Sequence, residues 1–285
     1  MTIGAIANVT NGVSKGTEEV VGSGPPTMEE LLVHYPARFT WPQLKTFINS
    51  GDLGLLKRDK KLQLRYNKWA VEIKKKYGSV TNYLLSYRLQ WGKPDTLSLL
   101  PSSLSVFEHA DQGSESISSE TPEYFEADIP YNSDLICIIQ NDWPYSVPPE
   151  IEHSLIWTRV PIFHPALIPQ TIDARIQQDG LCGFIGSTDT VESLPSLASC
   201  LPALADWGIA LDDLVRSPKG SDEEEKMVQD AGKEVREFVK RRWVEREWET
   251  AWFVNPPRLQ SVPGLAHIHV FARKKSVEEI ATWNS

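Results

Sequence analysis

Cysteine is scarce in this sequence, and the few cysteines are not spaced for a structural role. There are three of them, an odd number, and no two form a Cys-x-x-Cys pair. This pattern argues against a disulfide framework and a thiolate zinc site, and it is typical of a reducing compartment. The three are Cys137, Cys182 and Cys200.

Long apolar runs are also missing. No stretch of about 18 apolar residues occurs, so the sequence predicts no membrane span. Residues 1–10 contain neither a basic region nor a long apolar stretch, which argues against a secretory signal. The net charge of −9 gives no reason to expect DNA as a partner. We therefore expect a soluble, cytoplasmic protein with neither a membrane nor DNA as its partner.

Several catalytic motifs are absent as well. Gly180, Gly183 and Gly186 are not followed by Lys-Ser/Thr, so they do not form a phosphate-binding loop. Neither a Gly-x-Ser-x-Gly elbow nor a His-Glu-x-x-His helix occurs. These absences exclude a P-loop nucleotide site. They also mean that the sequence lacks the usual motifs of a serine hydrolase or a zinc peptidase.

The length and composition predict one large domain. The 285 residues, of which 41% are hydrophobic, are enough to bury a substantial core. Residues 1–26 are rich in Gly, Ser, Thr and Asn and are predicted to be a disordered tail, and a mobile loop is predicted near residues 95–122. Residues 27–285 are predicted to form a single α+β domain, with a helical N-terminal part packed on an antiparallel sheet with crossing helices.

Apolar periodicity and capping residues predict the helices. Asp59 and Gly78 bracket the longest helix of the N-terminal part, because Asp caps a helix start and Gly ends one. In the helix that follows, the spacing places Tyr87 on the inward face. The predicted helices begin at Met28, follow Thr40, and span residues 60–76, 79–89, 194–204 and 222–248.

Alternating apolar residues predict four strands in two pairs. The first pair flanks the turn-rich segment 141–145, and the second pair is joined through Pro256-Pro257. Residues 180–186 are predicted to be a glycine-containing loop. The predicted strands span residues 134–140, 154–160, 252–255 and 266–272.

Positive charge is concentrated in one segment. Residues 57–93 contain eleven Lys or Arg residues against Asp59 and Glu72. Such a run is commonly a solvated helix face, but it can also concentrate a polyanion at one side of an acidic protein. The solvated face is the favoured interpretation. The aromatic residues interleaved with the charges add support to the second one, although most of them have the spacing of core residues.

Three histidines are candidates for proton transfer. His267 and His269 are two residues apart on a predicted strand, so both rings point to one face. His153 lies at the start of another predicted strand and could approach that pair across the sheet. Paired imidazoles can bind a metal, move protons or hold phosphate. The alternative is that all three are buried and bonded to the backbone.

Other candidates lie in turns and acidic segments. Residues 141–145 follow a buried strand, where polar groups stand on a rigid support, although an Asx turn with its aromatic side chains in the core explains them equally well. Residues 221–225 could recognise a guanidinium or hold Mg²⁺, but Ser221 and Glu224 have the spacing of a capping box, which is the favoured interpretation. Asp212-Asp213 is a further acidic pair.

A set of short segments in a fixed order resembles a known family. The segments are Thr40-Trp41, residues 55–60, Lys76-Tyr77-Gly78-Ser79-Val80, Leu89-Gln90-Trp91, Asn141-Asp142-Trp143-Pro144-Tyr145, His153 with Trp157, residues 235–239, Trp252-Phe253-x-Asn255 and His267-Ile268-His269-Val270. Together, over residues 39–273, they resemble the fungal N-acetylglucosamine-induced-protein family. The arginine-containing cyclodipeptide synthases of fungi are similar to that family.

This similarity implies a tRNA-dependent enzyme of fungal secondary metabolism. It would take arginine and a second amino acid from arginyl-tRNA and another aminoacyl-tRNA and close a diketopiperazine, with no metal and no other cofactor. The acidic Asp-Asp-x-x-Glu motif associated with the synthases has its nearest counterpart in residues 221–225.

The resemblance gives the candidate residues specific roles. The expected catalytic residues are Asp142, His153, His267 and His269. The expected substrate-binding residues are Asn141, Trp143, Tyr145, Trp157, Asp222 and Glu225. The expected tRNA-binding residues are Lys57, Arg58, Lys60, Lys61, Arg65, Lys68, Lys74, Lys75 and Lys76.

Two other functions fit the same residues. One is a histidine-dependent nucleotide hydrolase or transferase, although Phe271 stands where a third alternating histidine would fall. The other is a non-enzymatic regulatory protein that responds to N-acetylglucosamine, in which the histidines, the turn and the charged segment would all have structural roles.

Overall fold

A computed structural model describes residues 22–93, 121–187, 190–260, 262 and 264–283 of the chain. Most of the predicted tail at 1–26 and nearly all of the predicted loop at 95–122 lie outside these described residues.

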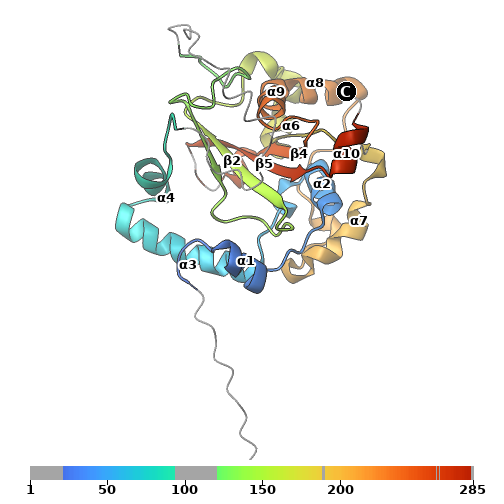
Figure 1. The fold of residues 1–285 in the computed structure, drawn as a ribbon. Coiled ribbons are helices and arrows are strands. Elements are labelled where there is room, and N and C mark those ends of the chain that lie inside the picture. The colour runs from blue at the N-terminus through green and yellow to red at the C-terminus, as the bar shows by residue number, and fades with distance from the viewer. Residues whose placement is uncertain (1–21, 94–120, 188–189, 261, 263, 284–285) are drawn as a thin grey trace, which may run out of the picture.

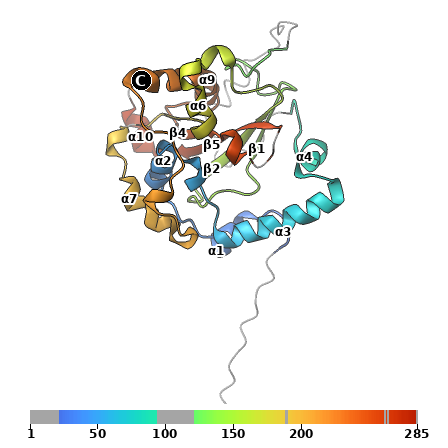
Figure 2. The same ribbon diagram turned by 180° about the vertical axis from the view of Figure 1, so that it is seen from behind.

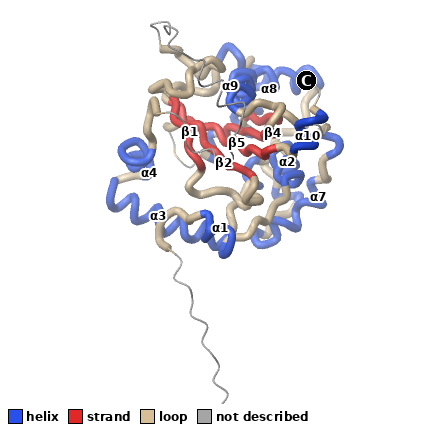
Figure 3. Tube along the Cα trace, viewed as in Figure 1, coloured by secondary structure: helices blue, strands red, loops and turns tan. Residues whose placement is uncertain are grey.

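A five-stranded antiparallel sheet forms the centre of the structure (Figures 1 and 3). Its spatial order is β1-β2-β5-β4-β3, so the two predicted strand pairs are confirmed and join through β2 and β5. The antiparallel sheet and its surrounding helices confirm the α+β class. The strands are β1 (Ile136–Gln140), β2 (Ile151–Thr158), β3 (Leu181–Ile185), β4 (Trp248–Val254) and β5 (Ala266–Lys274).

Strand β3 occupies the segment predicted to be a loop, so that prediction was wrong. It pairs with β4, with Gly183 opposite Trp252. A Cβ on Gly183 would lie 2.7 Å from the Trp252 indole, so the glycine makes room for the large ring. Here glycine serves close packing within a strand rather than a turn.

Most of the predicted helices are present, with somewhat different ends. Thr40 and Gln43 form a capping box at the start of α2, and Asp59 caps α3 through the backbone N–H groups of Lys61 and Leu62. No helix among the described residues is long and apolar enough to cross a membrane. The helices are α1 (Met28–His34), α2 (Trp41–Asn49), α3 (Lys60–Tyr77), α4 (Val80–Tyr83), α6 (Gln170–Asp179), α7 (Leu197–Cys200), α8 (Asp222–Ala231), α9 (Lys233–Arg242) and α10 (Val277–Thr282).

The predicted helix over 222–248 is divided in the structure. Helix α8 ends at Ala231, α9 begins after Gly232, and β4 starts at Trp248. A Cβ on Gly232 would lie 2.8 Å from the Trp252 ring, so the backbone approaches the sheet closely at this point. The break lets both helices follow the surface of the sheet.

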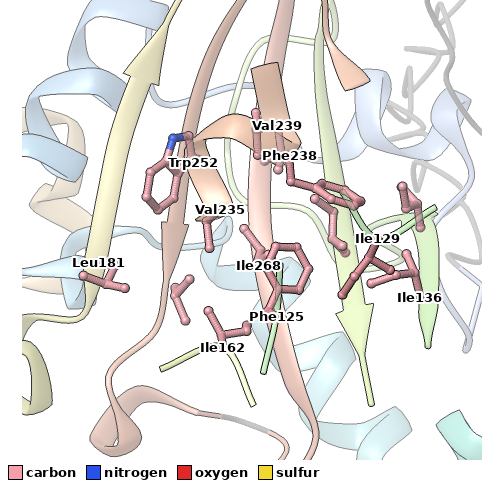
Figure 4. Packing of buried hydrophobic residues seen from close by; sticks show 14 of the residues in the cluster. Phe125, Ile129, Ile136, Ile162, Leu181, Val235, Phe238, Val239, Trp252 and Ile268 are labelled. Carbon is pink, nitrogen blue, oxygen red and sulfur yellow. The ribbon is translucent and has the colours of Figure 1, made fainter. Parts of the chain in front are cut away.

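Helices cover the two faces of the sheet in separate groups. Helices α6, α8 and α9 lie on one face, where Val235 and Phe238 pack on Ile268 (Figures 2 and 4). Helices α2 and α7 cover the other face, where Phe47 packs with Phe253 in a second cluster. Helices α1, α3 and α4 lie on this second side (Figures 1 and 2).

The predicted inward position of Tyr87 is wrong. Helix α4 continues into a wider turn over Leu84–Arg88, in which the N–H of Leu89 donates to the carbonyl of Leu84. This π-type bond adds a residue to the turn. The side chains that follow are therefore rotated away from the inward face predicted from α-helical spacing. Tyr87 is consequently 63% exposed.

Gly180, between α6 and β3, provides a test of this architecture. It has φ 81° and ψ −159°, a region open essentially to glycine alone, and a Cβ there would collide with the Val254 carbonyl oxygen. Gly208 also has a positive φ, but a Cβ there meets nothing within 4 Å. We expect Gly180→Ala to lower the free energy of unfolding by about 3 kcal/mol or more, and Gly208→Ala by only about 1 kcal/mol. Urea denaturation of both variants measures this difference, and equal losses would contradict it.

Candidate functional site

Three histidines meet on the face of the sheet that α2 covers. His153 lies on β2, and His267 and His269 lie on the neighbouring strand β5. In the antiparallel register His153 is opposite Phe271, and His269 is opposite Leu155. Because side chains alternate along a strand, all three imidazoles project from the same face. The expectation that His153 approaches the other two is therefore confirmed.

Hydrogen bonds fix where the protons of two imidazoles lie. Nδ1 of His153 lies 3.3 Å from the backbone N of Tyr145. Nδ2 of Asn141 lies beside the same ring, 3.3 Å from Nε2 and 3.5 Å from Nδ1. A backbone N–H can only donate, so this Nδ1 accepts and a neutral His153 carries its proton on Nε2. That Nε2 lies 3.1 Å from Nδ1 of His269, which must then accept. The two rings form a directed pair.

Polar side chains extend this pair at both ends. The Asn141 amide is itself oriented, because its Oδ1 accepts from the backbone N–H of Trp143 at 2.9 Å. Nδ2 of Asn255 lies 3.3 Å from Nε2 of His269, and a half-turn of that amide presents its oxygen to the N–H. The cluster of His153, His269, Asn141 and Asn255 is therefore a connected polar network inside the protein.

Aromatic rings hold the imidazoles in place. Phe253 stacks on His269 with 4.4 Å between centroids, and Phe271 lies 4.1 Å from His153. Tyr145 covers both imidazoles, at 5.1 Å from His153 and 5.7 Å from His269. Rings packed on both sides leave the histidines little freedom to turn.

Arg58 closes the site over Tyr145. Its guanidinium lies 5.4 Å from the Tyr145 ring and 4.8 Å from Tyr66, and its Nε donates to the Trp143 carbonyl at 2.8 Å. Arg58 was expected to bind tRNA, but in the structure its side chain contacts the 141–145 turn. The guanidinium places a positive charge beside the imidazoles.

Burial keeps the three imidazoles uncharged. His153, His267 and His269 are all less than 8% exposed. Burial, and to a smaller extent the charge of Arg58, lowers the pKa of His153 well below its usual range, and burial is also the main cause of the lowered pKa of His269. Burial lowers the pKa of His267 to about 4. At neutral pH the rings can accept protons but carry no charge.

His267 differs from the other two in its hydrogen bonding. Its Nδ1 lies 3.3 Å from the carbonyl oxygen of Leu265, which can only accept, so the proton lies on Nδ1. Trp157 stacks on the ring at 4.3 Å. This arrangement leaves Nε2 of His267 as the acceptor nitrogen.

Two cavities reach the histidine cluster from different directions. The α1 cavity, of about 270 Å³, is bounded by α1, the start of α3 and the 141–153 segment. The β5 cavity, of about 400 Å³, lies at the start of β5. The α1 cavity is lined by Met28, Leu31, Asp59, Leu62, Tyr145 and His153 among others. The β5 cavity is lined by Arg159, Asn255, Gln260 and His267 among others.

The donor set does not form a metal site. Among the described residues, no group of three or more His, Cys, Asp or Glu side chains is placed to hold a metal ion. The three histidines are arranged in ring contacts and mutual hydrogen bonds, which suit proton transfer better than coordination of a shared ion.

The acidic residues expected in the site lie elsewhere. The Asp142 carboxylate forms a bidentate pair with Arg88, at 2.7 and 2.8 Å. Glu225 forms a similar pair with Arg175, at 2.8 Å for both bonds. Asp222 and Glu225 belong to α8, which covers the opposite face of the sheet, so the sheet itself separates them from the histidines. The structure therefore does not bring these two expected substrate-binding residues together with the histidines.

The basic residues expected to bind tRNA fall into two groups. Lys57, Arg58 and Arg65 are engaged within the protein: Lys57 lies 5.3 Å from the Trp207 ring, and Arg65 is 9% exposed and pairs with Glu30 at 3.1 Å. The others are exposed along α3, whose first turn borders the α1 cavity. The exposed residues are Lys60, Lys61, Lys68, Lys74, Lys75 and Lys76.

Sequence reasoning missed two residues of the site. Asn255 was recognised only as part of a segment shared with the family, although a polar residue at the end of a buried strand is a usable signal. Asp59 was recognised only as the cap of α3, but it also lines the α1 cavity and is 5% exposed. Because the cap alone explains Asp59 in the sequence, its position in the cavity wall could not be predicted.

A comparison with family models identifies the chain's relatives. Residues 40–176 and 215–273 match a family described as "Protein of unknown function (DUF3605)". The chain belongs to this family. The matched residues include β1, β2, β4, most of β5 and all three histidines.

Two individual proteins are similar to the chain. N-acetylglucosamine-induced protein 1 of Candida albicans is 28% identical over 124 residues, which cover 44% of each chain, so the match spans less than half of that relative. These findings support the likeness to the fungal N-acetylglucosamine-induced proteins. The crystal structure of a protein named HTC1 covers 86% of this chain and 92% of its own, with 20% identity and a TM-score of 0.36.

The lowered pKa of His267 predicts a pH dependence of stability. In the unfolded chain the group titrates near 6.5, and in the folded chain near 4, so the unfolded state binds more protons as the pH falls below 6.5. This single group should therefore remove about 2 kcal/mol from the free energy of unfolding between pH 7 and pH 5. Denaturant titrations at both pH values test this, with His267→Gln as the comparison. The stability of wild type should fall more steeply than that of the variant, and parallel decreases would contradict the assignment.

Proposed function

We propose that the chain is a tRNA-dependent cyclodipeptide synthase that joins arginine and a second amino acid into a diketopiperazine. The observation that carries the proposal is the position of the α1 cavity. It opens onto His153 on one side and is bounded by the start of α3 on the other, and α3 is the helix that exposes the lysines. A docked polyanion and a proton acceptor would therefore lie beside one cavity.

The His153–His269 pair is suited to general base catalysis. An aminoacyl ester is already activated, so the enzyme needs to orient the reactants and remove a proton from the attacking α-amine. The pair is neutral at pH 7 and is joined by a 3.1 Å bond. A proton taken up at Nδ1 of His153, in place of the contact from the Tyr145 N–H, lets Nε2 pass its own proton to Nδ1 of His269.

The reaction requires no group beyond the two substrates. The α-amino nitrogen of one aminoacyl group attacks the ester carbonyl carbon of the other, so that a C–N bond forms and the C–O bond to the ribose breaks. His153, which lines the cavity, takes the amine proton at Nδ1 and returns it to the departing ribose oxygen. A second, intramolecular attack of the same kind closes the ring and releases the second tRNA.

Asp59 is the carboxylate best placed for an arginine side chain. Its Oδ1 accepts from the backbone N–H groups of Lys61 and Leu62, at 2.8 and 3.3 Å. Its Oδ2 forms a long ion pair with Arg38, at 3.6 Å, which exceeds the length of a hydrogen bond. A substrate guanidinium in the α1 cavity would be a planar donor to this oxygen, and the apolar wall formed by α1 would pack on its methylene groups.

In this proposal the remaining expected residues support the site. The Asp142–Arg88 pair positions the 141–145 turn, whose backbone and amide groups orient His153. The backbone carbonyl of Trp143 accepts from Arg58, and Trp157 packs on His267. The substrates, arginyl-tRNA and a second aminoacyl-tRNA, place the activity in the cytoplasm.

A second candidate is a non-enzymatic role in the response to N-acetylglucosamine. It is favoured by the name of the Candida relative and by the nearly complete burial of the three imidazoles. In that case the polar network is a structural part of the core, and its residues would affect stability alone.

Product formation distinguishes these functions. The protein is incubated with total tRNA, the amino acids, ATP and aminoacyl-tRNA synthetases, and products are identified by mass as cyclo(Arg-Xaa). We expect a product that disappears after RNase treatment. His153→Gln should lower the rate about 100-fold or more, since a positioned base contributes that much, and Asp59→Asn should reduce the use of arginyl-tRNA.

Matched variants elsewhere provide the controls. His164 lies outside the cluster, and Asp173 is exposed in the first turn of α6. His164→Gln and Asp173→Asn should leave the rate unchanged. Absence of any cyclic dipeptide with wild type would overturn the synthase proposal, and full activity in His153→Gln would show that the base is another residue.

A further inference from the structure

Three tyrosines form a cluster where α3 ends and α4 begins. Tyr77 lies 4.6 Å from Tyr87 and 5.3 Å from Tyr83, measured between ring centroids. Tyr83 and Tyr87 are nearly parallel, with 21° between their planes. We call these three residues the tyrosine platform. It stands at the corner where α4 and the end of α3 project beside the sheet (Figure 1).

Core packing does not explain the outer part of the platform. Tyr87 is 63% exposed, although the α-helical spacing would have buried it. The wide turn over 84–88 rotates it outward, and its ring contacts are with the other two platform tyrosines. A large aromatic ring held by other rings and open to solvent is a surface on which another flat ring can stack.

Positive charge adjoins the platform directly. Lys74, Lys75 and Lys76 form the last turn of α3 and are all exposed. Nζ of Lys76 lies 5.1 Å from the centroid of the Tyr77 ring, and Lys75 pairs with Glu72 at the surface. Ammonium groups are thus held next to exposed aromatic faces.

We infer that the tyrosine platform binds the unpaired nucleotides of an RNA, with bases stacked on the rings and phosphates on Lys74 to Lys76. Exposed rings beside a basic track are the general means by which proteins hold single-stranded nucleic acid without reading its sequence. A base-paired stem hides its base faces, so the platform selects the single-stranded end of the molecule. This inference rests on the proposed function, because a charged tRNA carries its amino acid on such an unpaired end.

Ring contacts connect the platform to the candidate site. Tyr83 lies 5.5 Å from Trp69, and Trp69 lies 5.1 Å from Trp143. Trp143 belongs to the turn that orients His153, and its carbonyl accepts from Arg58. A nucleotide stacked on the platform would therefore be connected, through the packed rings of Tyr83, Trp69 and Trp143, to the turn that lines the α1 cavity.

Direct RNA binding tests the inference without any chemistry. The probe is a fluorescein-labelled single-stranded RNA of about 12 nucleotides, the size that such surfaces accommodate, and binding to the full chain is followed by fluorescence anisotropy. Wild type should bind this strand more tightly than the same strand annealed to its complement. Tyr87→Ala should weaken binding about 5- to 100-fold, because one stacked base contributes that much.

Three further variants separate stacking from charge and from folding. Tyr87→Phe keeps the ring and should retain wild-type affinity. Lys75→Gln should weaken binding and reduce the steepness of its salt dependence, since one phosphate contact is lost. Tyr124 contacts His164 in another part of the chain, so Tyr124→Ala should bind RNA normally. Circular dichroism checks that each variant is folded.

The outcomes separate this inference from the proposed function. Unchanged affinity in folded Tyr87→Ala, or equal affinity for single-stranded and duplex RNA, would overturn the platform, even if wild type makes a cyclic dipeptide. Binding of a protein partner rather than RNA to this corner would do the same. Conversely, selective single-strand binding that depends on Tyr87 would support the platform even if no cyclic dipeptide is found.

Discussion

The antiparallel pairing of β2 with β5 is the constraint on which the candidate site depends. Its register places Leu155 opposite His269 and Trp157 opposite His267, so that three imidazoles project from one face. Side chains alternate with a period of two, and a shift of one residue in either strand would turn its histidines toward the core under α9. The apolar residues Ile156 and Ile268, which are opposite each other on that other face, prevent such a shift because they would lose their burial.

The surroundings of the histidines decide what they can do. The helices and turns of the N-terminal half exclude water from the imidazoles, and this burial keeps them neutral. Arg58 adds a fixed positive charge at the edge, which further disfavours protonation of His153 and His269. The polar network is nevertheless satisfied internally, since amides and backbone groups supply partners for the ring nitrogens. A buried and fully connected network of this kind holds one geometry, which suits both a preorganised active site and a rigid core.

Local signals in the sequence predicted the fold better than the site. Asp59 and Gly78 defined α3 nearly to the residue, because caps act over a few positions. The alternation of His267 and His269 placed both on one face, because the strand period is fixed. In contrast, the strand at Gly183 and the helix break at Gly232 were not predicted, since each glycine makes room for Trp252, which lies far away in the sequence. The contacts of Arg58 with the 141–145 turn and the role of Asn255 were not predicted for the same reason: their partners come near only in the folded chain.

The division of the helices between the two faces affects the order in which the protein can be assembled. Several helices on the histidine side of the sheet, among them α2, precede β1. The sheet that supports them is not complete until β5 has been made, and His153 and His269 are 116 positions apart. During synthesis, the apolar face of α2 therefore stays exposed until the ribosome has produced the strands on which it packs. Contacts this distant along a chain form slowly, and the waiting surface is open to aggregation in the meantime. Nascent chains that end before β5 are consequently the ones most in need of a chaperone.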